Sequence, residues 1–192
     1  MHYFIFPEFD TTLYQASASR NTGLDEILEI EKTMNQSGGN VRVSRILIKF
    51  DLAEISRSIV RGQIATDAKY YLNMYDANPT ELSYSQSLYA YPISASWVPG
   101  EGFRADNPKT QEGATWEFRD GISEKTYWGR AEDTAVSSSG GAWFSSSFAS
   151  QSFEYETRDM RMDVTPIVDD WLTKVYPNNG FIVKRSGSLG NL

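Results

Sequence analysis

The chain has no cysteine, a single histidine and no apolar run approaching the roughly 20 residues of a membrane-spanning helix. Without cysteine there is no disulfide framework and no thiolate metal site. A Ser-His-Asp triad or a histidine-based zinc site would have to use His2 near the N-terminus, so neither is expected. Basic residues are also few: 18 lysines and arginines stand against 25 aspartates and glutamates, a net charge of −7. This balance argues against nucleic-acid binding and against docking on an anionic membrane.

The N-terminal residues 1–7 are mostly apolar, but they do not have the features of a secretion signal. The run is short, it is broken by Pro7, and no basic leader precedes it. We therefore expect a protein that is made and retained in the cytoplasm.

The composition favours an all-β fold, because aromatic residues make up 14% of the chain and serine, threonine, glycine and asparagine are frequent. The clearest strand is 43–50, in which Ile46, Ile48 and Phe50 point to one face and the intervening residues to the other. Further candidate strands are 68–76, 86–93, 114–118, 151–157 and 181–184, with weaker ones at 3–6, 12–15 and 26–32. With turns such as 37–40 between them, they predict an antiparallel β-sandwich of jelly-roll type, one domain over residues 1–192.

One substantial helix is predicted, over about residues 165–176. Thr165 can cap it through its hydroxyl, and Pro166 suits the first helical position because no backbone donor is needed there. One apolar face recurs at helical spacing: Val168, Trp171, Leu172 and Val175. We expect Trp171 to be buried between this helix and a sheet. Earlier in the chain, Asp51 is expected to cap a turn at 52–54.

Two long connections, 94–111 and 131–150, interrupt the strand pattern. Connections of this length in a compact domain are usually functional or unstructured. The second is rich in serine and glycine, yet it carries large aromatic side chains. Aromatic residues in such polar surroundings are expected to stack on a sugar or to be buried in a partner. The candidate contact residues are Trp128, Trp143, Phe144 and Phe148, whereas Trp171, on the apolar face of the predicted helix, is expected to be structural.

Carboxylates are the remaining candidates for catalytic groups and metal ligands. The acid and the nucleophile of a glycosidase could come from one of three pairs: Asp169 and Asp170, Glu154 and Glu156, or Glu101 and Asp106. The first two pairs lie on polar faces of predicted elements, where solvated surface is the expected role. Asp10 and Asp163 could ligate calcium, but no D-x-D-x-D-G loop surrounds them. We therefore expect no enzymatic activity, no metal site and no cofactor.

Several motifs follow one another in an order shared with a known domain family. Residues 45–52 read R-x-L-x-x-F-D-L. Around them stand an N-x-G turn at 21–23, an A-x-x-x-L strand at 68–74, a W-x-P-G segment at 97–102 followed by Thr115-Trp116, and D-V-T…V…W…N-x-G-F at 163–181. This order resembles the DNRLRE-type domains, the disaggregatase-related jelly rolls, although the six-letter motif that names the family is not present. Family domains usually continue with one or two more strands. The resemblance thus implies truncation at the C-terminus, or another element in the last strand position.

The resemblance implies three competing functions. We favour a structural protein of a bacteriophage virion, in the tail, neck, baseplate or fibre, because family domains occur there and no secretion signal is expected. Such a protein would be made in the host cytoplasm and would contact other virion proteins as a homo- or hetero-oligomer. The alternative is a carbohydrate-binding module of a longer polysaccharide-acting protein, with a glycan as its partner. A glycan-cleaving enzyme has the least support from the residues.

Overall fold

The computed structural model describes residues 2–34, 41–77, 85–121, 125–128, 135–154 and 159–185. This part of the chain is mostly β-strand in antiparallel sheets, with two short α-helices and the 3-10 helix η1 (Gln15–Ser17). The predicted all-β fold is therefore confirmed, while the jelly-roll topology remains a prediction. The predicted turn at 37–40 lies outside the described residues. Among the described residues, no helix is long and apolar enough to cross a membrane.

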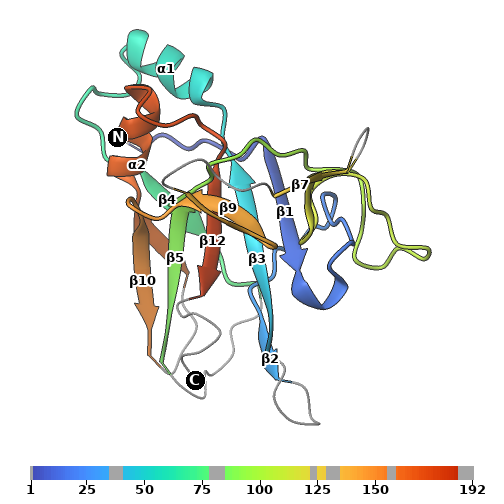
Figure 1. Cartoon of the computed structure of the whole chain (residues 1–192). Helices are drawn as coiled ribbons and strands as arrows, with labels where there is room; N and C mark the ends of the chain where they lie inside the picture. The colour runs from blue at the N-terminus through green and yellow to red at the C-terminus, as the bar shows by residue number, and fades with distance from the viewer. Residues whose placement is uncertain are drawn as a thin grey trace.

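A six-stranded sheet forms the centre of the molecule (Figure 1). Its order is β1–β3–β12–β5–β10, β2 also pairs with β3, and every neighbouring pair is antiparallel. The strands are β1 (Phe9–Tyr14), β2 (Lys32–Met34), β3 (Val41–Lys49), β5 (Gln86–Pro92), β10 (Ala149–Phe153) and β12 (Phe181–Arg185). The central pair, β3 and β12, comes from distant parts of the sequence and is aligned with Val183 opposite Ile46.

Consecutive residues of the two central strands are buried, so the sheet carries an apolar core on each face. Ile46, Leu47 and Ile48 are at most 5% exposed, and so are the three residues of β12 that lie opposite them, 181–183. Successive side chains of a strand point to opposite faces. Accordingly Ile46 and Ile48 belong to the first core and Leu47 to the second. The two predicted faces of 43–50 are confirmed, and both are covered at their centre.

The first core is covered by two helices and a two-stranded ribbon. The ribbon pairs β4 (Tyr71–Met74) with β11 (Met160–Asp163), and the helices are α1 (Leu52–Val60) and α2 (Thr165–Leu172). Their buried residues in this core are Ile55, Leu72, Met160, Met162, Ile167, Val168 and Trp171. Figure 1 shows the two helices close together at one end of the sheet.

The second core is covered by the connection between β5 and β10. This connection contains the pairs β6 (Phe118–Asp120) with β7 (Thr126–Tyr127) and β8 (Ala135–Ser138) with β9 (Gly141–Phe144). Gly140 and Gly141 at the β8–β9 turn have φ of 88° and 115°, a backbone region that glycine adopts readily. The predicted loop at 131–150 is therefore wrong over the hairpin, whose second strand lies across the sheet in Figure 1.

Helix α2 confirms the predicted helix and its buried face, but it is shorter than expected. Val168 and Trp171 are 4% and 3% exposed. The helix ends at Leu172, and Lys174 then adopts a left-handed φ of 63°. Val175 lies beyond this break and is 60% exposed, so it does not extend the apolar face.

The predicted hydroxyl cap of α2 is wrong. The hydroxyl of Thr165 accepts the N–H of Tyr70 at 2.9 Å, which ties the helix to the segment before β4. The carboxylate of Asp163 instead accepts the N–H of Thr165 at 3.0 Å and satisfies one of the free donors at the helix start. At α1 the sequence predicted only a turn. Asp51 caps a complete helix there, and its carboxylate accepts the N–H of Ala53 at 2.8 Å.

The N-terminal segment is extended, but it is not the strand predicted at 3–6. The hydroxyl of Tyr3 accepts a hydrogen bond from Ser58 Oγ at 3.1 Å, which places this segment beside α1. Ile5 packs against the first core, whereas Phe4 and Phe6 on either side are 69% and 83% exposed.

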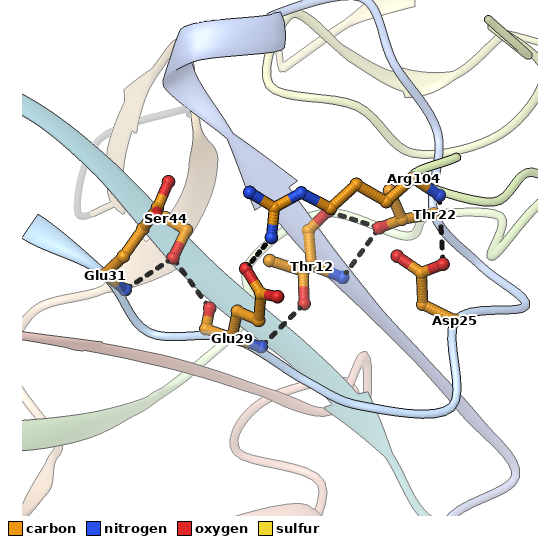
Figure 2. A network of polar contacts seen from close by, with 7 residues as sticks. All are labelled: Thr12, Thr22, Asp25, Glu29, Glu31, Ser44 and Arg104. Atoms are coloured by element: carbon orange, nitrogen blue, oxygen red, sulfur yellow. Dashed lines mark hydrogen bonds and ion pairs between the residues drawn. The ribbon is translucent and has the colours of Figure 1, made fainter. Parts of the chain in front are cut away.

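Side-chain hydroxyls, rather than another strand, bond the outer edge of β1 (Figure 2). Thr22 Oγ1 accepts the N–H of Thr12 at 3.2 Å and donates to the carbonyl of the same residue at 2.7 Å. Thr12 Oγ1 in turn accepts the N–H of Glu29 at 3.1 Å. The strand predicted at 26–32 is wrong for this reason: the backbone of this segment bonds to hydroxyls, and β2 begins only at Lys32.

The same network continues to β3 and to the long connection (Figure 2). Ser44 Oγ accepts the N–H of Glu31 and donates to the carbonyl of Glu29, both at 2.7 Å. Arg104 forms an ion pair with the Glu29 carboxylate and donates its backbone N–H to Asp25 at 2.9 Å. The carboxylates of Glu29 and Asp25 are thus engaged in holding loops together.

Asn21 joins its own loop to three points of the connection between β5 and β6 through its buried side chain. Its Nδ2 donates to the carbonyls of Pro99 at 2.6 Å and Ala114 at 2.8 Å, and its Oδ1 accepts the N–H of Gly102 at 2.8 Å. Gly100 packs directly on this amide with a φ of 79°, and a Cβ there would come within 2.5 Å of Oδ1. The N-x-G turn therefore anchors the long connection that covers the second core.

Truncation of Trp171 tests the first core. Its ring packs on Phe181 with centroids 4.6 Å apart. We expect Trp171→Ala to lower the free energy of unfolding by about 3–5 kcal/mol, as for other buried aromatic residues, measured by urea denaturation. The control Val175→Ala, on the exposed segment after the helix, should change it by less than about 0.5 kcal/mol. Equal losses in the two variants would contradict the buried role of Trp171.

Candidate functional site

Two of the four predicted contact residues are buried inside the molecule. Trp128 is 4% exposed, and its Nε1 donates to the carbonyl of Thr115 at 2.8 Å. Trp143 on β9 is 7% exposed and belongs to the second core. Both were selected because their sequence surroundings are polar. That reason does not hold for Trp143, because the neighbouring glycines form a hairpin turn that folds this ring onto the sheet.

The other two predicted residues remain accessible and have different ring partners. Phe148 is 54% exposed, just before β10. Phe144 is half-buried, and its ring stacks on Tyr176, beyond α2, with centroids 4.3 Å apart. Phe148 shares no ring contact with Phe144; it packs against two tyrosines of β5.

Tyr89, Tyr91 and Phe148 form a continuous aromatic strip on one face of the main sheet. Tyr89 and Tyr91 are alternate residues of β5, with ring centroids 6.0 Å apart and planes inclined by 15°. Phe148 lies 5.5 Å from the first ring and 5.7 Å from the second. Both tyrosines are half-buried. Strand alternation alone places these two tyrosines on one face, so they could have been predicted as contact residues together with Phe148.

Serine hydroxyls extend the aromatic strip along the same face. Ser150 of β10 lies opposite Tyr89, and Ser152 lies opposite Ser87 with their Oγ atoms 2.8 Å apart. Because Ser87, Tyr89 and Tyr91 alternate along β5, these hydroxyls and the rings point to the same side. Exposed hydroxyls therefore border exposed aromatic surface.

Two cations, Arg45 and Lys184, adjoin the aromatic strip; we call them the cation pair. They occupy neighbouring positions on β3 and β12, one residue beyond the pairing of Ile46 with Val183. The Lys184 ammonium lies 5.3 Å from the ring centroids of both Tyr91 and Trp143.

The Arg45 guanidinium lies behind Lys184, between two tryptophans. It is 4.7 Å from the Trp116 ring and 5.1 Å from the Trp143 ring, and Nη1 donates to the carbonyl of Gly140 at 2.6 Å. Such contacts stabilise a cation through the negative face of the ring.

Burial and mutual repulsion destabilise the charged forms of this pair. Burial lowers the pKa of Arg45 to about 10. Burial, and then the neighbouring charge of Arg45, lower the pKa of Lys184 below its usual range. Within the described chain, neither cation forms an ion pair with a carboxylate.

The structure describes the surroundings of most of the carboxylate candidates. Asp169 and Glu154 are exposed, Asp163 is engaged at the start of α2, and Glu156 lies outside the described residues. Asp106 accepts the N–H of Phe103 and the hydroxyl of Thr110, which lower its pKa and fix a turn. Over the described ranges, no group of three or more His, Cys, Asp or Glu side chains is placed to hold a metal ion.

Comparison with family models, with curated proteins and with solved structures finds no match to this chain. The resemblance to DNRLRE-type domains stays a prediction from the sequence, and function has to be argued from the surface itself.

Alanine substitutions distinguish the structural role of the buried Trp143 ring from that of the exposed Phe148 ring. Trp143 fills the second core beside Arg45 and Tyr91, so Trp143→Ala should lower the free energy of unfolding by about 3–5 kcal/mol. Phe148→Ala, at an exposed position of the same cluster, should lower it by less than about 1 kcal/mol. Thermal and urea unfolding would measure both. A stable Trp143→Ala protein would mean that this ring is not part of the core.

Proposed function

We propose that the chain is a non-enzymatic binding module that recognises carbohydrate through the aromatic strip. The observation that carries the proposal is the accessible triad of Tyr89, Tyr91 and Phe148, bordered by the hydroxyls of Ser150 and Ser152. A sugar ring has faces of C–H groups and a rim of hydroxyls. The C–H faces pack on aromatic rings and the rim exchanges hydrogen bonds with hydroxyls, so the two surfaces are complementary.

The position of the strip supports this use. Tyr89 and Tyr91 lie on β5 of the central sheet, where the backbone holds side chains more rigidly than a loop does, and Phe148 directly precedes β10. Tyrosine rings also lose little conformational freedom on binding, because each has only two side-chain torsions. The face is therefore organised before a ligand arrives.

A structural role in a phage virion is the second candidate, and a different surface favours it. Phe4 and Phe6 of the N-terminal segment are largely exposed, and so is Val60 at the end of α1, at 87%. Two exposed phenylalanines on one segment that lies beside α1 favour a protein–protein contact. In this proposal the chain contacts other proteins of the tail, neck, baseplate or fibre, and the aromatic strip remains available for a ligand.

The genetic neighbourhood tests the virion proposal. We expect the gene to lie among tail or baseplate genes. A location in a polysaccharide-utilisation cluster would contradict the virion role and leave the carbohydrate-binding role in place.

The carbohydrate proposal is tested by binding measurements on variants of the strip. On a panel of polysaccharides, examined by affinity gel electrophoresis and calorimetry, we expect at least one to bind the wild-type chain. Phe148→Ala and Tyr89→Ala should each weaken that binding about tenfold, which corresponds to about 1.4 kcal/mol for a lost aromatic contact. The control is Tyr75→Ala, at a position 78% exposed and outside the strip. Failure of every polysaccharide to bind, or equal binding by the strip variants and the control, would refute the proposal.

A further inference from the structure

Arg45 and Lys184 differ from other cations of the described chain, because neither forms an ion pair with a carboxylate. Other cations, such as Lys49 with Glu8 and Arg57 with Asp51, have a carboxylate within 4 Å. The chain also carries an excess of acidic residues, 25 against 18 basic ones. Yet among the described residues, these two adjacent, partly buried cations have only ring faces and one carbonyl as partners. Two like charges held together in this way gain stability when an anion binds beside them.

Lys184 is the member of the pair that a ligand on the aromatic strip would meet. Its ammonium lies over the ring of Tyr91, which is itself part of the strip. Arg45 is held behind it by two tryptophans and the Gly140 carbonyl. A sugar stacked on the strip would therefore have a positive charge at its edge, with a second one behind.

We propose that the carbohydrate bound by the aromatic strip is acidic, and that Lys184, with Arg45 behind it, binds its carboxylate or sulfate. This inference rests on the carbohydrate-binding role proposed above and adds the charge of the ligand. An ammonium partly withdrawn from water forms a stronger pair with an anion than a fully solvated one does, because the surrounding dielectric constant is lower.

The overall charge of the chain makes the inference specific. With a net charge of −7 the molecule as a whole repels a polyanion. Binding of an acidic polysaccharide would therefore depend on a local group of cations rather than on general attraction. Loss of this binding when one of the two cations is removed would therefore distinguish local recognition from general attraction.

The test compares acidic polysaccharides with neutral forms of the same backbones. Polygalacturonate, alginate and hyaluronan are each paired with their carboxyl-reduced forms, and a sulfated galactan with its desulfated form. We expect at least one acidic member to bind at least tenfold more tightly than its neutral form. The two kinds of pair also show whether carboxylate or sulfate is the preferred group.

Lys184→Gln provides the residue-level test. It should remove the preference for the acidic form, so that the variant binds the acidic and the neutral form with equal affinity. The matched control is Lys125→Gln, because Lys125 also lies over an aromatic ring, 5.4 Å from the centroid of Phe118, but outside the strip. Equal thermal melting of both variants and wild type would establish that folding is intact. In the wild-type chain, the bound anion should also raise the pKa of Lys184, which NMR titration of its side chain would follow.

The outcomes separate the two proposals. Equal binding of acidic and neutral forms, or an unchanged preference in Lys184→Gln, would overturn the inference. If Phe148→Ala still weakens binding in that case, the carbohydrate-binding role survives. Absence of binding to every polysaccharide would overturn both. Self-association of the chain that Lys184→Gln abolishes, without polysaccharide binding, would assign the cation pair to a carboxylate of a partner protein instead.

Discussion

The fold depends on two central strands, each of which carries a run of three consecutive buried apolar residues, 46–48 in β3 and 181–183 in β12. A strand that is buried on both sides must be covered on both sides, because each exposed aliphatic residue would forgo about 1.5–3 kcal/mol of burial. On one face the helices α1 and α2 and the β4–β11 ribbon provide the cover. On the other face the cover is a connection with little regular structure, assembled from short hairpins and turns. This asymmetry shapes the molecule: one layer packs through secondary structure, and the other has to be fixed by individual side chains.

Asn21 fixes that second layer, whereas the hydroxyls of Thr12 and Ser44 bond the segment before β2, which packs on the first core. Buried backbone groups of a loop need partners as much as those of a strand do. Here the single amide of Asn21 holds three backbone groups of the connection between β5 and β6. The second layer is thereby rigid enough to hold Trp116 and Trp143 against the sheet, and these rings enclose Arg45. The cation pair thus depends on loop chemistry remote from it in sequence.

Sequence periodicity correctly predicted the elements that depend on the local spacing of apolar residues. The strand at 43–50, the helix beginning at Thr165 and the burial of Trp171 all follow from spacing, and they are confirmed. Periodicity failed where tertiary partners replaced local ones. Segment 26–32 alternates like a strand but bonds to hydroxyls, and Trp143 lies in a polar stretch that folds back as a hairpin. Of the candidate site, Phe148 was selected from its sequence context. Arg45 and Lys184 were not, because their proximity follows from the pairing of β3 with β12, which no local pattern encodes.

The threonine that bonds the edge of β1 has a consequence for how copies of this chain can meet. An open strand edge is a template on which the strand of another molecule can continue the sheet, and such growth has no natural end. Here the outward N–H and carbonyl of Thr12 are already bonded to one buried hydroxyl. Fusion of two molecules along this edge would first require those bonds to break. Crowded copies of the chain can therefore touch through faces and loops, which give defined and finite contacts, without merging into an endless sheet at this edge.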